Sequence, residues 1–185
     1  MAHRLFVFSG PPGAGKGTVI GLVRAQRPDI ALSVSATTRA PRPGEVDGVS
    51  YHFMTDAQFD DLVAKGGFLE WAHVHDHRYG TPRMHVEKVL EERSLILEID
   101  PQGAFNVRAA MPEAVLVFIA PPSMEVLRQR LVGRGTEDPA ELAKRLSDVQ
   151  SFMDASSRYD EVVVNDVLDD TVKHVLAIIK RYESC

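Results

Sequence analysis

The stretch Leu5-Phe-Val-Phe-Ser-Gly10-Pro-Pro-Gly13-Ala-Gly15-Lys16-Gly17-Thr18-Val19 joins a short apolar run to a glycine-rich segment and then to residues with helical spacing. A buried strand followed by a glycine-rich turn and a helix is the context of a phosphate-binding P-loop. The glycines let successive backbone N–H groups turn inward around phosphate oxygens, and the helix that follows adds its positive end. We expect Lys16 to reach the β- and γ-phosphates of a nucleoside triphosphate.

The loop departs at one position from the general P-loop pattern. The residue after the lysine is normally Ser or Thr, whose hydroxyl ligates Mg²⁺, but here it is Gly17, with Thr18 one position later. This variant resembles the P-loop of adenylate kinases and favours contact with magnesium through water. We expect the whole loop to bind ATP: Gly10, Pro11, Pro12, Gly13, Ala14, Gly15, Lys16, Gly17 and Thr18.

The charge of the chain argues against some classes of partner. Its 185 residues include 21 Lys and Arg against 26 Asp and Glu, and the net charge of −5 argues against coating a nucleic acid polymer or an anionic membrane. Fifteen of the cations are Arg, which points either to an anionic ligand or to a coding bias. Cys185 is the single cysteine, and no apolar run approaches the roughly 18 residues of a membrane span. We therefore predict a cytoplasmic protein.

Short apolar runs alternate with segments of helical spacing along the chain. The runs cover residues 5–8, 32–34, 95–99, 115–119 and 162–164. Strands that are apolar on both faces and separated by helices are typical of a parallel sheet buried on both sides. We predict an α/β fold of the P-loop NTPase type, in which helices cover both faces of a parallel sheet.

Two polar stretches, residues 37–48 and 133–139, interrupt this alternation. Neither is typical of a linker between independent domains, and both read as insertions at the ligand-binding end of the sheet. We predict a single domain of residues 1–185, with an insertion of short strands and a small lid. The core is about 1–35, 86–129 and 147–185, the insertion about 36–85 and the lid about 130–146.

Residue pairs typical of helix N-termini predict where several helices start. Asp100-Pro101, Thr81-Pro82 and Asp138-Pro139 each place a capping side chain before a proline at the first helical position. Thr55 with Gln58 predicts a capping box.

Further motifs follow the P-loop and indicate a family. They occupy residues 33–48, 51–53, 68–72, 79–81, 97–103, 130–137 and 163–166. Their order and spacing resemble those of guanylate kinases from residue 5 to 180. The resemblance implies transfer of the γ-phosphate of ATP to GMP, giving ADP and GDP, with Mg²⁺ as cofactor. A GTPase would need an Asn-Lys-x-Asp sequence to read its base, and the chain has none.

The chemistry of this reaction explains the abundance of cations in these motifs. The second pKa of a phosphate monoester is about 6, so GMP is mostly a dianion at neutral pH and is already a nucleophile. The obstacle is bringing two polyanions together in line, which calls for fixed cations and exclusion of water. The resemblance assigns Arg39, Arg42, Tyr51 and Tyr79 to the GMP phosphate, and Arg130, Arg134, Arg145 and Asn165 to ATP. The implied catalytic set is Lys16, Arg39, Arg42, Arg134 and Arg145.

Recognition of guanine needs hydrogen-bond acceptors, because guanine presents N1–H and an N2 amino group. The resemblance assigns Glu70 and Asp100 as these acceptors, and Ser35 and Thr81 as hydroxyls able to donate to O6. A site built around such bonds rejects analogues that lack them by as much as ~10⁴-fold. Asp100 is also expected to hold magnesium through water, as is Thr18, with Glu98 contributing at the GMP site. The sequence leaves dGMP open as an acceptor and leaves the oligomeric state open.

Two other interpretations stay open from the sequence. One is a non-catalytic guanylate-kinase-like interaction domain, although such domains have degraded P-loops and Lys16, Arg39 and Arg134 are all present here. The other is a related kinase acting on a small phosphate such as a ribose bisphosphate.

For the alternating histidines at positions 73, 75 and 77, a polar strand edge is favoured over a metal site.

Overall fold

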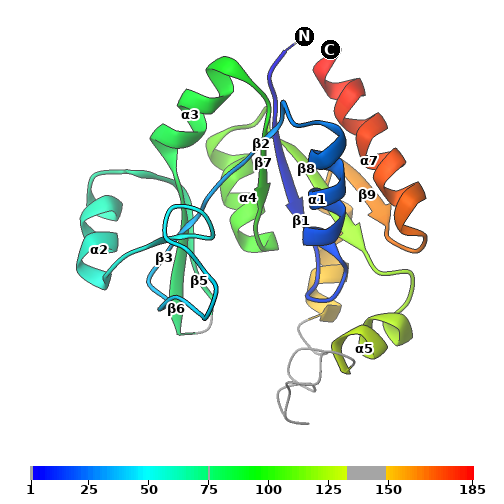
Figure 1. Ribbon diagram of the computed structural model, residues 1–185, viewed down its shortest axis with the longest axis horizontal. Coiled ribbons are helices and arrows are strands. Elements are labelled where there is room, and N and C mark those ends of the chain that lie inside the picture. Colours follow the sequence, from blue (N-terminus) through cyan, green and yellow to red (C-terminus); the bar gives the residue numbers. More distant parts are fainter. Residues whose placement is uncertain (1, 75, 133–148) are drawn as a thin grey trace.

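The computed structural model describes residues 2–74, 76–132 and 149–185, and within them two β-sheets lie side by side (Figure 1). The main sheet has five parallel strands in the spatial order β2-β7-β1-β8-β9, which confirms the predicted parallel sheet. Their bounds are β1 Leu5–Ser9, β2 Ala31–Leu32, β7 Leu95–Glu98, β8 Val115–Ala120 and β9 Glu161–Val164.

The strand predicted at residues 32–34 is wrong at its carboxyl end, because β2 stops at Leu32. The Ser33 N–H still donates to the Ile96 carbonyl at 2.9 Å. The chain then leaves the main sheet and joins the second sheet at Ala36. The apolar run at residues 32–34 therefore includes the end of β2 and the first residues after the chain leaves the main sheet.

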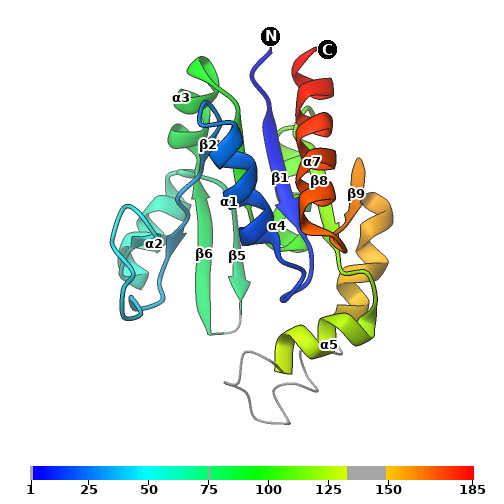
Figure 2. The same ribbon diagram turned by 45° about the vertical axis from the view of Figure 1, so that its right-hand side comes forward.

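Helices cover both faces of the main sheet, as predicted, with α1 and α7 on one face and α3 and α4 on the other (Figure 2). The second sheet carries α2 (Figure 1). The helices are α1 Lys16–Gln26, α2 Asp56–Ala64, α3 Arg83–Glu92, α4 Pro101–Ala110, α5 Met124–Val132 and α7 Leu168–Glu183, with helical residues at 149–155 and a 3-10 turn at Ser156–Arg158.

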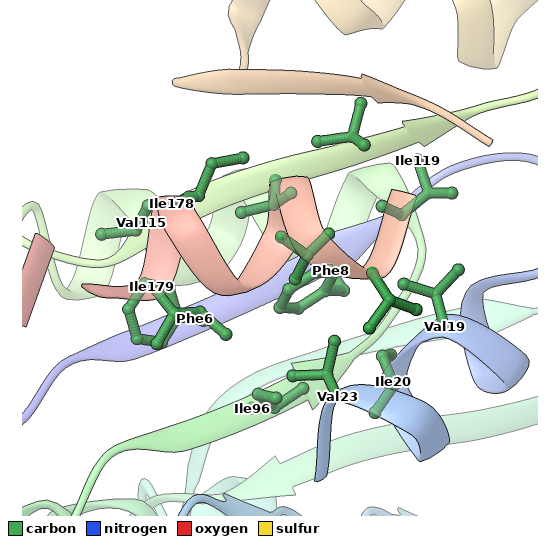
Figure 3. Packing of buried hydrophobic residues seen from close by; sticks show 14 of the residues in the cluster. Phe6, Phe8, Val19, Ile20, Val23, Ile96, Val115, Ile119, Ile178 and Ile179 are labelled. Atoms are coloured by element: carbon green, nitrogen blue, oxygen red, sulfur yellow. The ribbon is translucent and has the colours of Figure 1, made fainter. Parts of the chain in front are cut away.

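Alternating side chains along β1 explain the two-sided cover. Phe6 and Phe8 are buried in the cluster that contains α1 and α7, as Figure 3 shows. Leu5 and Val7 point the other way and are buried with residues of α3 and α4. Because successive side chains of a strand face opposite sides of the sheet, a strand that is apolar at every position needs helices on both.

The second sheet has the spatial order β4-β3-β6-β5. Its long hairpin of β5 and β6 is antiparallel, and β3 joins it antiparallel to β6. The sheet has its own small apolar cluster, in which Phe59 of α2 stacks on Phe68 of β5 with ring centroids 4.4 Å apart. The bounds are β3 Ala36–Thr37, β4 His52–Phe53, β5 Phe68–Val74 and β6 His77–Pro82.

Two of the predicted helix caps are confirmed and one is wrong. Asp100 caps α4 by accepting from the Gly103 N–H at 2.8 Å, and Thr55 and Gln58 form the capping box of α2. Thr81 does not cap α3, which begins at Arg83 with Pro82 in the cap position and no side-chain cap hydrogen bond; its hydroxyl instead donates to Glu70. Asp138 lies outside the described residues.

A buried carboxylate joins the two ends of the chain at the edge of the main sheet opposite the P-loop. Glu183 is 5 % exposed and accepts from the Ser94 hydroxyl at 2.6 Å and from Arg27 at 3.0 Å. The Ala2 N–H donates to the Glu183 carbonyl at 3.1 Å. These bonds attach the last turn of α7 to α1 and β7.

In the described parts of the chain, no helix has both the length and the apolar character that crossing a bilayer requires.

Candidate active site

Several of the predicted site residues lie at the carboxyl ends of strands of the main sheet. The P-loop follows β1, Glu98 and Asp100 follow or end β7, and Asn165 follows β9. Ligands of open parallel α/β sheets bind at this edge. The hairpin β5–β6 packs on α4, and this contact brings Glu70 to the same edge.

The P-loop adopts a conformation that requires glycine at several positions. Gly13 and Gly15 have φ of +83° and +89°, which side chains disfavour. At Gly10, a Cβ atom would lie 2.2 Å from the Ile119 carbonyl oxygen of β8. Lys16 folds back over the loop, and its ammonium donates to the carbonyls of Gly10 at 2.8 Å and Pro11 at 3.2 Å. The lysine is thus held over the concave backbone that would receive phosphates.

Asn165 fastens the P-loop to the far edge of the main sheet. Its side chain is buried, and the amide Nδ2 donates to the Ala14 carbonyl at 2.7 Å. At Gly15, a Cβ atom would lie 2.5 Å from the same Nδ2, so only glycine allows this approach. The Asn165 carbonyl in turn accepts from Arg130 Nη2 at 3.2 Å. Arg130 Nη1 is buried with no hydrogen-bond partner among the described residues, and so keeps a donor available beside the loop.

Glu98 faces the first turn of α1 across the strand edge. Its carboxylate oxygens are 3.7 and 3.8 Å from the position that a Cβ atom would take at Gly17. The residue is exposed, yet desolvation by the surrounding protein raises the pKa of its carboxyl, while the charge of Lys16 lowers it. A carboxylate, a lysine and the exposed Thr18 hydroxyl therefore border the opening of the loop.

Glu70 lies in the second sheet and is 7 % exposed. Its Oε1 accepts a hydrogen bond of 2.6 Å from the Thr81 hydroxyl of the neighbouring strand. Its Oε2 is 3.0 Å from the position that a Cβ atom would take at Gly103, so α4 approaches the carboxylate closely. Burial raises the pKa of Glu70 to about 7; the Thr81 hydrogen bond lowers it and the nearby Asp100 charge raises it. The two predicted acceptors for guanine are thus brought together.

Three of the residues predicted to bind the acceptor phosphate, Arg39, Tyr51 and Tyr79, form a second cluster. Arg39 is 9 % exposed and its guanidinium lies 5.4 Å from the Tyr51 ring centroid. The rings of Tyr51 and Tyr79 meet edge to face at 5.9 Å. Arg42 has an exposed side chain, and Ser35 is half-buried with its carbonyl accepting from the His52 N–H at 2.9 Å.

Some predicted residues lie outside the described part of the chain, namely Arg134, Arg145 and most of the predicted lid. Of the alternating histidines, His75 is also outside it, and His73 is exposed beside the Trp71 ring at 5.7 Å. Within the described residues, no group of three or more His, Cys, Asp or Glu side chains could hold a metal ion.

Two features of the site were missed by the sequence reasoning. Glu45 binds Arg39, and the signal available was its place at the end of the turn sequence Arg42-Pro-Gly44-Glu45. The hydroxyls of Ser9 and Tyr159 are both buried, and Ser9 is the last residue of β1, directly before the P-loop. Burial raises the pKa of Tyr159 to about 12, so this hydroxyl stays neutral. No local pattern marks it.

Comparisons with known proteins agree on a family. The family model described as guanylate kinase matches residues 2–182. A guanylate kinase of Leifsonia xyli is 51% identical over 177 residues, covering 95% of this chain and 70% of that protein, and one of Thermobifida fusca is 50% identical, covering 95% and 90%. The crystal structure of guanylate kinase from Anaplasma phagocytophilum superposes with a TM-score of 0.80 at 32% identity, covering 98% of this chain and 87% of that one.

Proposed function

Because the chain belongs to the guanylate kinase family, we propose that its strand-edge site carries out the reaction of that family, with ATP on the P-loop and GMP between the two sheets. The activity is transfer of the γ-phosphate of ATP to GMP, which gives ADP and GDP. The interaction-domain and ribose-bisphosphate interpretations are not favoured. The observation that carries the proposal is that a P-loop with its lysine in place, the buried Glu70 and the partly buried Asp100 lie at one edge of the main sheet.

On the ATP side, the loop backbone and Lys16 bind the phosphates. The N–H groups around Gly13 and Gly15 and the start of α1 supply positive potential where the phosphate charge lies. Arg130 offers its free Nη1 donor beside Asn165. We assign Arg134 and Arg145 to the same phosphates on the family resemblance, and they would close the site against water.

On the GMP side, two clusters of residues divide the ligand between them. Arg39, Arg42, Tyr51 and Tyr79 hold the phosphate, which is mostly a dianion and needs no general base. Glu70 and Asp100 accept the guanine N1–H and N2 hydrogens, with Ser35 nearby. Since the phosphate acceptor is already a nucleophile, the work of these residues is orientation and charge stabilisation.

A divalent metal fits the donors at the opening of the loop. The Thr18 hydroxyl and the carboxylates of Glu98 and Asp100 are hard oxygen donors, which suit Mg²⁺ held through water. Magnesium supplies neutralisation of the phosphate charge when it is bound. Gly17 leaves the room between α1 and Glu98 that such waters would occupy.

We also propose a cytoplasmic location, because ATP and GMP are nucleotides of the cell interior.

A coupled assay of ADP release tests this function. The protein is supplied with ATP, Mg²⁺ and GMP, dGMP, AMP, CMP or UMP in separate reactions, and we expect turnover with GMP far above that with AMP. Equal rates with AMP and GMP would contradict the guanine-acceptor assignment. Absence of turnover with every acceptor would favour the interaction domain. The control is the Lys16→Ala variant, which should lose turnover while its thermal unfolding stays near that of the parent protein.

A further inference from the structure

The buried charge of Arg39 is paired before any phosphate arrives. Its guanidinium lies among the Tyr51 and Phe53 rings, whose centroids are 5.4 and 5.9 Å away. A buried charge without a partner is costly. Arg39 Nη2 donates to Glu45 Oε1 at 2.8 Å and Nη1 donates to the Ala40 carbonyl at 2.8 Å. These two bonds use one hydrogen of each Nη group and fix the plane of the guanidinium.

The other oxygen of Glu45 closes a turn that carries the second arginine. The Glu45 N–H donates to the Arg42 carbonyl at 3.0 Å, and Gly44 has φ +87°, as in a type II turn with proline at its second position. Glu45 Oε2 accepts from the Arg42 N–H at 2.7 Å. One carboxylate therefore joins the backbone of Arg42 to the side chain of Arg39.

We propose that Glu45 is a positioning residue for acceptor binding, which sets Arg39 and Arg42 at a fixed separation for the phosphate of GMP. This inference rests on the proposed function, since it takes both arginines as phosphate ligands. Glu45 is itself an anion beside the phosphate site, so its direct electrostatic effect on a dianion is repulsive. Its position is favourable to binding only through the geometry it imposes on the arginines.

The two possible roles of Glu45 predict changes of opposite direction in GMP affinity. If Glu45 acts only through its charge, removing that charge strengthens GMP binding; if it positions the arginines, removing it weakens GMP binding. Glu45→Gln keeps the size of the side chain but can accept only one of the two hydrogen bonds. Glu45→Asp keeps the charge but is one methylene shorter, so it cannot span both partners.

Asp47 provides a matched control in the same loop. Its Oδ1 accepts from the Phe53 N–H at 2.9 Å, and the side chain is exposed. Asp47→Asn removes one negative charge from the loop and keeps an oxygen for that bond. An effect of net charge alone would appear in Asp47→Asn as well as in Glu45→Gln.

The experiment measures Kd for GMP by calorimetry without ATP, KM for GMP and for ATP in the ADP-release assay, and inhibition by guanosine, which lacks the phosphate. We expect Glu45→Ala, Glu45→Gln and Glu45→Asp to raise Kd and KM for GMP about 10-fold or more, from the loss of charge-assisted hydrogen bonds. The KM for ATP, the affinity for guanosine and the Asp47→Asn variant should stay within about twofold of the parent.

Three outcomes would overturn the positioning role. Unchanged or tighter GMP binding in the Glu45 variants would show that the carboxylate acts by charge or not at all. An equal loss of guanosine affinity would show general distortion of the insertion. Parent-like behaviour of Glu45→Asp would show that charge without reach suffices. Failure of the proposed function is distinct, because then the parent protein itself would bind no GMP and release no ADP with it.

Discussion

The Thr81 hydroxyl donates a hydrogen bond of 2.6 Å to Glu70 Oε1, and both side chains are buried. A hydroxyl has one hydrogen, so Thr81 is committed to the carboxylate in this state and would have to turn to donate to guanine O6. The bond also lowers the pKa of Glu70 against the effect of burial. Thr81 therefore supports the ionised acceptor that guanine requires.

Replacing Thr81 by valine, which has a similar shape but no hydroxyl, should weaken GMP binding. The Glu70 carboxylate would lose its donor, and its pKa would rise further. We expect the KM for GMP to increase about 10-fold near pH 7.5, from the loss of one charge-assisted hydrogen bond. Steady-state kinetics measures this, with Thr81→Ser as the control that keeps the hydroxyl. A valine variant with the parent KM would separate Thr81 from guanine binding.

The affinity for GMP should fall as the pH drops through about 7. Burial raises the pKa of Glu70 to about 7, and only the ionised carboxylate accepts the guanine donors. The affinity for GMP therefore has its full value above this pH and falls below it, by up to tenfold for each pH unit. Calorimetry between pH 6.5 and 8.5 tests this, above the second phosphate pKa of about 6. Glu70→Gln should bind weakly at every pH, and a parent protein with a flat profile would contradict the assignment.

Glu70 should also lower the stability of the protein as the pH rises toward 7. Its pKa is 4.5 in the unfolded chain and about 7 in the folded one, so between these values the folded state holds the proton that the unfolded state has lost. The free energy of unfolding then decreases as the pH rises from about 4.5 to about 7, and it levels off above that. We expect Glu70→Gln to gain about 2 kcal/mol on the parent between pH 5 and pH 8, measured by urea unfolding. A gain that is independent of pH would show that the carboxylate does not titrate in this way.

Local patterns were sufficient for the core of the molecule. Phe6 and Phe8 alternate with apolar residues of the other face, so β1 reads as a buried strand, and the glycines after it predict the P-loop conformation. Asp100 before Pro101 predicts the cap of α4 because capping depends on neighbours within three residues. These features depend on contacts that are close in sequence.

The second sheet was less predictable, because its contacts join distant residues. β3 and β4 are two residues long and have no periodicity to detect. The pair Thr81-Pro82 has the pattern of a helix cap, yet the hydroxyl of Thr81 bonds to Glu70, eleven residues earlier, because a buried carboxylate needs a donor. Local chemistry could not indicate that the hydroxyl would donate to this distant carboxylate and would not cap the helix.

The bond from Asn165 to the Ala14 carbonyl should matter for ATP more than for GMP. Nδ2 donates at 2.7 Å in a buried position, so Asn165→Ala leaves a carbonyl of the P-loop unsatisfied. We expect a loss of about 1–2 kcal/mol in urea unfolding and a higher KM for ATP, with the KM for GMP little changed.

Comparing Asn165→Asp with Asn165→Ala tests whether the amide hydrogen of Asn165 is what holds the P-loop. The aspartate has almost the same shape, but it places a carboxylate against the Ala14 carbonyl and near the phosphates, where the asparagine placed a donor. It should therefore be worse than Asn165→Ala in both stability and KM for ATP, whereas a residue that merely fills space would tolerate Asp better than Ala. The Asn165 N–H donates to the Ala120 carbonyl at 2.8 Å, and because this bond does not involve the side chain, we expect it to keep the end of β9 in place in all three proteins. An Asp variant equal to or better than the Ala variant would mean that the amide hydrogen does not hold the P-loop.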